Sequence, residues 1–261
     1  SGVIRISTAY NLTCDNTIIK GTGSGTGIAL GGGDDFTISG CTVRDYDRGI
    51  GFGSLCADNL VVTSFNATSV SVGINSMGIC NNFTMRNFYL SLDSGGYGLS
   101  HISNTDTGVL LENGVIYGCD AGLDFAYPSS YWINSTINNV TFIGTGTNIY
   151  TNTYGLYKFK GENNTIKNSN FSGLKYGIYF NATNTIIFNN TFASSGASHI
   201  YNYLTADVNS FNYTINGTNY GNSWEEFCNL SISDTNGDGY GDSGTNYPYN
   251  STQSSKFNSS G

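Results

Sequence analysis

The chain has 261 residues, of which 38% are hydrophobic and only 11% are charged, and its formal net charge is −8. Nucleic-acid binding depends on Lys and Arg, and this chain holds 10 of them, so a nucleic-acid partner is excluded. No apolar run is long enough to span a membrane as a helix. The chain starts at Ser1 without the features of a signal peptide, so we expect any such peptide to have been removed or to lie outside this sequence.

Apolar residues recur in a phrase repeated about eight times at a spacing of roughly 19 to 29 residues, which is typical of a solenoid. The first apolar positions, here called anchors, are Ile19, Ile38, Val62, Met85, Leu111, Ile137, Ile166 and Ile187. A second apolar residue follows most anchors, at Val43, Leu90, Ile116, Phe142, Phe171 and Phe192. A Gly-apolar pair then follows, at Gly27-Ile28, Gly49-Ile50, Gly73-Ile74, Gly98-Leu99, Gly122-Leu123, Gly155-Leu156 and Gly177-Ile178, with His199-Ile200 in the last repeat.

Short strands interrupted by Gly, Asn or Asp at this period suit one coil of a parallel β-helix, and amphipathic helix patterning is absent from the sequence. The pattern therefore predicts an all-β protein. We expect a right-handed single-stranded parallel β-helix of about eight to nine coils over residues 1–207. Residues 208–261, where the period ends, are predicted to form a short C-terminal cap with a calcium loop at 234–245.

Sequons of the form Asn-x-Ser/Thr are more frequent than composition alone accounts for, which predicts an N-glycosylated surface. A structural alternative stays open, because β-helix turns favour Asn in left-handed geometry and Asn side chains form ladders between coils. The 14 sequons start at Asn11, Asn66, Asn82, Asn134, Asn139, Asn163, Asn170, Asn181, Asn189, Asn212, Asn216, Asn229, Asn250 and Asn258.

The six cysteines are widely spaced, without the short spacings of a zinc site, and so predict disulfides in an oxidising, extracellular compartment. Cys56 and Cys80 precede neighbouring anchors by similar distances, and adjacent coils lie about 4.8 Å apart, within reach of a disulfide. We therefore predict a Cys56–Cys80 bond. Pairing stays open for the other four, for which buried free thiols are the alternative: Cys14, Cys41, Cys119 and Cys228.

An acidic loop near the C-terminus has the spacing of a calcium site, with oxygen side chains at loop positions 1, 3, 5 and 9, glycine at 6 and a backbone carbonyl at 7. Thr245 stands where an EF-hand has its last Glu ligand, so the loop is closer to dockerin-like or thrombospondin-type loops. An acidic solvated turn is the alternative. The predicted ligands are Asp234, Asn236, Asp238, Tyr240 and Asp242.

The Asn-x-Ile-x-x-Asn-x-Phe phrases, the Gly-Ile pairs, and the closing Gly221-Asn222-Ser223-Trp224 before the acidic loop resemble the NosD-like right-handed β-helix repeats of archaeal cell-surface proteins. The resemblance covers nearly the whole chain. It implies the fold more firmly than an activity, since the same repeat occurs in sugar-binding and sugar-hydrolysing β-helices. It also implies a glycosylated surface component with calcium at its C-terminal end. Glu225-Glu226 and Cys228 depart from the usual cap.

Catalysis is disfavoured by the residues available for it. The Asp34-Asp35 and Asn104-Thr105-Asp106 elements occur in the wrong order for a polygalacturonase-like pair of carboxylates, and no Gly-His-Gly or Arg-x-Lys element accompanies them. The nearest lyase-like cluster, Asp45, Asp47 and Arg48, is better explained as a turn ion pair. His101 and His199 lie beside strand positions and are expected to pack. We therefore predict no enzymatic activity and no catalytic residue.

Aromatic residues raise a second possibility, sugar binding, because the chain has 19 Tyr and 2 Trp. Phe142, Phe171 and Phe192 recur at one coil position, which predicts an internal stack. An exposed stripe, suited to a ligand or to a subunit interface, is expected from Tyr176, Tyr179, Tyr201 and Tyr203.

A structural role joins most of these observations, because the ends of a solenoid expose strand edges unless they are capped. We predict an extracellular, N-glycosylated subunit of a surface filament, sheath or surface layer, assembled with copies of itself through end-to-end or strand-donation contacts. The alternative is a polysaccharide-binding module or a β-helix polysaccharide lyase or hydrolase. Calcium and covalent N-linked glycans are the expected cofactors.

Overall fold

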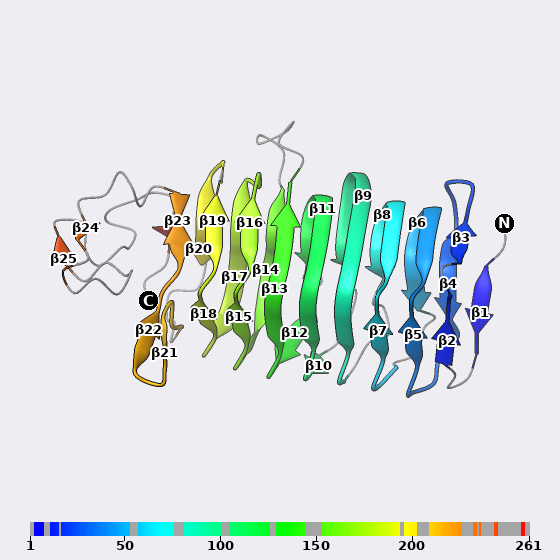
Figure 1. Ribbon diagram of the computed structural model, residues 1–261, viewed down its shortest axis with the longest axis horizontal. Helices are drawn as coiled ribbons and strands as arrows, with labels where there is room; N and C mark the ends of the chain where they lie inside the picture. Colours follow the sequence, from blue (N-terminus) through cyan, green and yellow to red (C-terminus); the bar gives the residue numbers. More distant parts are fainter. Residues whose placement is uncertain are drawn as a thin grey trace.

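The computed structural model is an all-β solenoid in which parallel strands from successive coils stack side by side along one axis (Figure 1). The all-β parallel β-helix predicted from the sequence is therefore confirmed. Among the described residues, no helix is long and apolar enough to cross a membrane. The structure describes residues 3–7, 11–15, 17–52, 57–75, 81–100, 105–125, 129–144, 153–193, 196–202, 209–225, 232–233, 235, 243–244 and 257–258.

Twenty-two strands form one sheet that winds along the solenoid, and two short hairpins lie near the C-terminal end. Register within this sheet is parallel throughout, and each coil pairs with the coil before it and the coil after it. The strands are β1 (Ile4–Ile6), β2 (Asn11–Thr13), β3 (Ile18–Lys20), β4 (Thr26–Leu30), β5 (Thr37–Ser39), β6 (Thr42–Phe52), β7 (Val61–Thr63), β8 (Asn66–Asn75), β9 (Thr84–Ser100), β10 (Thr105–Thr107), β11 (Leu110–Asp124), β12 (Tyr131–Ile133), β13 (Thr136–Ile143), β14 (Tyr154–Glu162), β15 (Thr165–Lys167), β16 (Asn170–Ser172), β17 (Tyr176–Thr183), β18 (Ile186–Phe188), β19 (Thr191–Ala193), β20 (Ser198–Asn202), β21 (Tyr213–Ile215), β22 (Thr218–Tyr220), β23 (Ser223–Trp224), β24 (Ile232–Ser233), β25 (Ser243–Gly244) and β26 (Phe257–Asn258).

Three rows of apolar side chains run along the inside of the solenoid, because each repeat places its apolar residues at the same points of the coil. Row one holds Leu12, Ile38, Val62, Met85, Leu111, Ile137, Ile166 and Ile187. Row two holds Ile19, Val43, Ala67, Leu90, Ile116, Phe142, Phe171, Phe192 and Trp224. Row three holds Ile4, Ile28, Ile50, Ile74, Leu99, Leu123, Leu156, Ile178 and Ile200.

These rows confirm the repeat with one correction, which concerns its first member. Ile19 was expected to be a row-one anchor, but Leu12 occupies that position and pairs with Ile38, whereas Ile19 pairs with Val43 in row two. The apolar pattern around Ile19 matches either row, since both positions need one buried aliphatic residue. Only the pairing between coils separates the two assignments.

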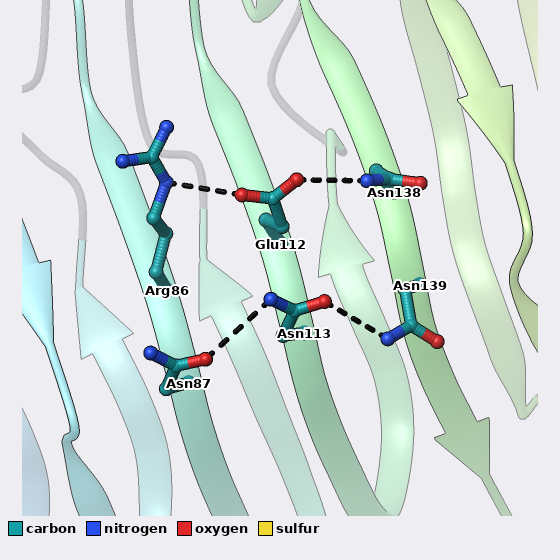
Figure 2. Close-up of polar contacts among 6 residues, drawn as sticks. All are labelled: Arg86, Asn87, Glu112, Asn113, Asn138 and Asn139. Atoms are coloured by element: carbon teal, nitrogen blue, oxygen red, sulfur yellow. Dashed lines mark hydrogen bonds and ion pairs between the residues drawn. The ribbon is translucent and has the colours of Figure 1, made fainter.

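Polar ladders fix the corners between rows, and Figure 2 shows two of them on β9, β11 and β13. Asn113 donates to Asn87 at 3.5 Å and accepts from Asn139 at 2.9 Å. Beside them, Glu112 pairs with the Arg86 guanidinium at 3.1 Å and accepts from Asn138 at 2.8 Å. Each ladder satisfies side-chain amides that would otherwise need water, and so it ties neighbouring coils together.

The C-terminal end of the solenoid is closed by an aromatic ring, and parallel pairing continues past residue 207 into the predicted cap. Trp224 stacks on Phe192 with the ring centroids 4.8 Å apart, and β23 pairs with β19. Further along, β26 pairs with β20. The hairpins β21–β22 and β24–β25 lie at this end of the molecule (Figure 1).

Candidate functional site

A patch of tyrosines covers the outside of row three on three successive strands, β14, β17 and β20. On each strand one tyrosine directly follows the buried row-three residue, and on β14 and β17 a second tyrosine precedes that residue by two positions. The apolar row-three residues Leu156, Ile178 and Ile200 are fully buried beneath them. This patch, here called the tyrosine face, consists of Tyr154, Tyr157, Tyr176, Tyr179 and Tyr201.

The rings of the tyrosine face contact one another in two files along the solenoid axis. Tyr154 and Tyr176 stack at 5.1 Å with an interplanar angle of 8°, and Tyr179 and Tyr201 stack at 5.0 Å with an angle of 4°. Between the files, Tyr176 meets Tyr179 edge to face at 5.9 Å. Stacked and edge-to-face pairs are favourable, so the rings hold each other in place. The result is a rigid surface of ring edges and phenol groups that repeats with the coil.

Lysines flank this face on both sides. The ammonium of Lys158 lies 5.1 Å from the centre of the Tyr157 ring, and that of Lys175 lies 5.5 Å from the centre of the Tyr176 ring. Both distances are within the range of a cation–π contact. Lys158 lies within β14, directly after Tyr157, at a bulge with φ of 53°, whereas Lys175 immediately precedes β17. One cation therefore follows a tyrosine along the chain and the other precedes one.

Toward the N-terminus, the line of the tyrosine face continues as a row of buried polar residues. Asn75, Ser100 and Asp124 occupy the positions on β8, β9 and β11 that Tyr157 occupies on β14, and they are 3%, 9% and 7% exposed. Tyr97 on β9 is half-buried. The buried polar residues and the tyrosines therefore lie on one line along the axis of the solenoid.

Burial and neighbouring charge raise the pKa values of several groups along this line. Burial raises the pKa of Tyr97, and the carboxylates of Asp124 and Asp120 raise it further because they oppose a phenolate. Burial also raises the pKa of Asp120 and, together with the neighbouring phenols, that of Tyr154. The raised pKa values keep the phenols of Tyr97 and Tyr154 neutral at physiological pH.

The carboxylates considered for catalysis have structural roles. Asp34 accepts from the backbone N–H of Asp58, and Asp35 accepts from the amide of Asn59, so both belong to a corner ladder. Asp106 is buried on β10 and accepts from the indole N–H of Trp132 at 3.3 Å. Asn104 lies outside the described residues.

The lyase-like cluster and His199, which were also considered for catalysis, have structural partners as well. Asp47 pairs with Arg48 at 3.5 Å, as expected for a turn ion pair, and Asp45 pairs with Arg44 at 3.4 Å. His199 is fully buried and packs against both Phe192 and Trp224, which confirms the predicted packing role. His101 lies outside the described residues.

One disulfide joins the first coils of the solenoid. Cys14 and Cys41 are bonded, with their Cα atoms 4.7 Å apart. Cys119 is a buried thiol whose pKa burial raises to about 12, so it stays protonated. The predicted Cys56–Cys80 bond and Cys228 lie outside the described residues, and that bond stays a prediction.

The predicted calcium ligands Asp234, Asn236, Asp238, Tyr240 and Asp242 also lie outside the described residues. The strands on either side of them pair antiparallel, with Ser233 opposite Ser243, so the ends of the loop are held together. Elsewhere in the described part of the chain, no group of three or more His, Cys, Asp or Glu residues is placed to hold a metal ion. Calcium binding therefore stays a prediction.

The sequon asparagines fall into distinct groups by what their amides contact. Asn82, Asn139 and Asn189 donate their side-chain amides to asparagines of the preceding coil at 2.6–3.0 Å, which is the structural alternative considered above. Exposed sequon asparagines outside these ladders are Asn11, Asn66, Asn134, Asn163, Asn212 and Asn216. Asn170 and Asn181 are half-buried. Asn229 and Asn250, as well as the side chain of Asn258, lie outside the described part of the structure.

Sequence reasoning found part of the tyrosine face and missed the rest. Tyr176, Tyr179 and Tyr201 were predicted to form an exposed stripe and lie together as expected, whereas Tyr203 lies outside the described residues. Tyr154 and Tyr157 were missed because an insertion lengthens the repeat before them. The signal was present: Tyr157 follows the Gly155-Leu156 pair as Tyr179 follows Gly177-Ile178.

Comparison with known proteins assigns the chain to no family. No family model matches the chain, and no curated protein matches it. Among solved structures, it is similar to the catalytic unit of a thermostable GH87 α-1,3-glucanase from Streptomyces thermodiastaticus strain HF3-3, with 15% identity and a TM-score of 0.32. The similarity covers 86% of this chain and 64% of that catalytic unit, so the chain spans less than two thirds of its length. The NosD-like type and the archaeal origin stay predictions.

Proposed function

We propose that this protein binds an extended polysaccharide along the tyrosine face. The observation that carries the proposal is the mutual contact of five tyrosines from three successive coils, four of them half-buried at the surface and Tyr154 buried against them. The edges of the stacked tyrosine rings offer apolar contact to a sugar, and the phenol hydroxyls offer hydrogen bonds to its polar groups. A surface that repeats with the coil suits a ligand that also repeats along one direction.

The length and direction of the face agree with a chain-like ligand. The tyrosine face crosses the three strands β14, β17 and β20, and two spacings of about 4.8 Å give roughly 10 Å along the solenoid axis. Asn75, Ser100 and Asp124, farther along the same line, are buried. A linear polymer would therefore contact the protein on the tyrosine strands, over more than one coil.

The test is polysaccharide binding by the tyrosine variants, measured by affinity electrophoresis and isothermal titration calorimetry over a panel of soluble glycans. We expect Tyr176→Ala with Tyr179→Ala to weaken binding at least about tenfold, near 1.4 kcal/mol. Tyr176→Phe with Tyr179→Phe should retain the rings and lose less. Tyr117, which is 42% exposed on β11 away from this face, provides the control substitution Tyr117→Ala. Thermal unfolding of each variant establishes that it is folded.

Two results would contradict the proposal. If the wild-type protein binds no glycan of the panel, polysaccharide binding is ruled out for that panel. If Tyr117→Ala weakens binding as much as the double tyrosine variant does, the tyrosine face is not the binding site. Because the proposal contains no catalytic step, we also expect no new reducing ends to appear during incubation with the bound polysaccharide.

Self-association at the cell surface is the second candidate, favoured by the first coil. Ile18 on β3 is 54% exposed, and β1 pairs with β4 alone among the described strands. An apolar, unpaired edge of this kind suits pairing with another copy. Electron microscopy with calcium and after chelation tests this candidate: filaments or sheets that loosen on chelation support assembly through calcium-bound ends. Dispersed monomers under both conditions contradict it.

A further inference from the structure

Lysine is concentrated at the tyrosine face, although the chain as a whole is acidic. The protein has 10 Lys and Arg against 18 Asp and Glu. Lys158 and Lys160 nevertheless lie on β14, and Lys175 lies next to β17. All three are half-buried, and so their aliphatic chains lie against the surface. A local group of cations on an acidic protein points to an anionic ligand.

The backbone positions of these lysines are fixed by local structure. Lys158 occupies the bulge between Tyr157 and Phe159, with φ of 53°. The backbone N–H of Lys175 donates to the hydroxyl of Thr153 at 2.8 Å. Each ammonium then lies within 5.5 Å of the centre of a tyrosine ring. The cations are therefore held beside the rings that would contact a sugar.

Charge changes sign along this line, from lysines beside the tyrosines to carboxylates near Tyr97. Burial lowers the pKa of Lys160, and the nearby positive charge of Lys158 lowers it further. Two cations that repel each other gain from an anion placed between or beside them. At the other end, Asp124 and Asp120 act on Tyr97 and would repel such an anion. An anionic polymer is thereby directed to β14, β17 and β20.

We propose that the tyrosine face selects a polysaccharide whose sugars carry carboxylates, with Lys158 and Lys175 binding the carboxylate groups and the tyrosines contacting the rings. This inference rests on the proposed polysaccharide binding and names the substrate class. The net charge of −8 opposes the binding of a polyanion, so the binding of an acidic polysaccharide requires these local cations. The carboxylates of a uronic acid polymer repeat along the chain, as the lysines and tyrosines do along the coils.

The experiment compares two polymers that differ only in charge, polygalacturonate and its fully methyl-esterified form, by calorimetry at low and high salt. We expect the wild-type protein to bind the acidic form about tenfold more tightly at low salt, with the preference reduced by added salt. Lys158→Gln with Lys175→Gln should abolish this preference while leaving affinity for the neutral ester within about twofold. Lys20→Gln with Lys167→Gln, on β3 and β15, makes the same change in net charge away from the face.

The outcomes separate this inference from the proposal beneath it. Equal binding of both polymers by the wild type, or an equal loss in the Lys20 and Lys167 control, would overturn the selection of carboxylates while the tyrosine face remains a sugar site. Loss of preference in the Lys158 and Lys175 variant alone supports it. If the wild type binds neither these polymers nor any other glycan, polysaccharide binding itself fails.

Discussion

Left-handed backbone at the corners of the coil explains why this chain is rich in asparagine. Asn82, Asn134 and Asn163 have positive φ at one corner, and Asn139 and Asn189 have positive φ at another. Asparagine tolerates this conformation better than most residues with a side chain. In all five cases a threonine stands two residues after the asparagine, at a strand position where a β-branched residue is favoured. The geometry of the coil therefore generates the Asn-x-Thr pattern at these positions.

Asp106 is the residue at which we expect stability to depend most on pH. It is 1% exposed, and burial raises its pKa from 3.8 to about 8, with Asp58 raising it and the hydrogen bond from Trp132 lowering it. A carboxyl with a raised pKa binds its proton more tightly in the folded state. The free energy of unfolding should therefore be highest below about pH 4 and fall by up to about 1.4 kcal/mol per pH unit toward pH 8.

Asp106→Asn should remove this slope, because the amide keeps the shape of the protonated carboxyl without ionising. Urea unfolding followed by Trp fluorescence between pH 4 and pH 9 measures the effect. The exposed Asp93→Asn substitution serves as the control and should leave the slope unchanged. A wild-type stability that rises steadily over this range would show that Asp106 is ionised in the fold.

At the scale of the strand, glycine before seven of the nine row-three residues lets rows two and three meet closely. A Cβ on Gly122 would lie 2.3 Å from Cδ1 of Phe142 and 2.5 Å from the carbonyl oxygen of Gly155. Gly155 meets Phe171 and the next coil in the same way. These positions therefore need glycine for space, since none of these φ values is positive. This close contact explains why a Gly-apolar pair recurs in the sequence.

Gly122→Ala should lower the free energy of unfolding by about 1–3 kcal/mol, as expected for overpacking of a core in which neither the ring nor the backbone can move away. Chemical denaturation measures it. Gly31→Ala is the matched control, because its Cβ would approach no atom nearer than 3.3 Å, and it should cost less. Equal costs for the two substitutions would mean that backbone entropy, rather than the close approach, sets the effect.

At the scale of the whole molecule, each coil contacts only its neighbours, so the two ends are the places where the core is least protected. Trp224 covers Phe192 at the C-terminal end. At the N-terminal end, the Cys14–Cys41 bond joins the first coils across 27 residues of sequence. The disulfide links these coils covalently, in addition to the backbone pairing between β2 and β5.

Replacing both cysteines of this bond should destabilise the N-terminal coils by about 3–4 kcal/mol, the entropy of closing a loop of this size. Cys14→Ala with Cys41→Ala tests this by thermal unfolding and by hydrogen exchange of β2 and β5. Unchanged protection in these strands would contradict the prediction. If a reducing agent lowers the melting temperature of this variant further, the protein has a second disulfide. Replacing Cys56 and Cys80 with alanine then tests whether they form it.

The sequence determined the repeating unit of the fold, because periodic apolar residues and corner asparagines are local features that each coil repeats. It could not determine register: Ile19 fits two rows equally well, and only pairing with Val43 decides between them. It also could not assemble the tyrosine face, since Tyr154 and Tyr157 follow an insertion that breaks the period before β14.

Tertiary structure alone brought the tyrosines of three strands and the flanking lysines onto one surface. Parallel stacking of coils converts positions about 22 residues apart, such as Tyr157 and Tyr179, into neighbours about 4.8 Å apart. The side chains that meet in this way have no signature within any one repeat. A site made of one residue from each coil exists only when the coils are in register.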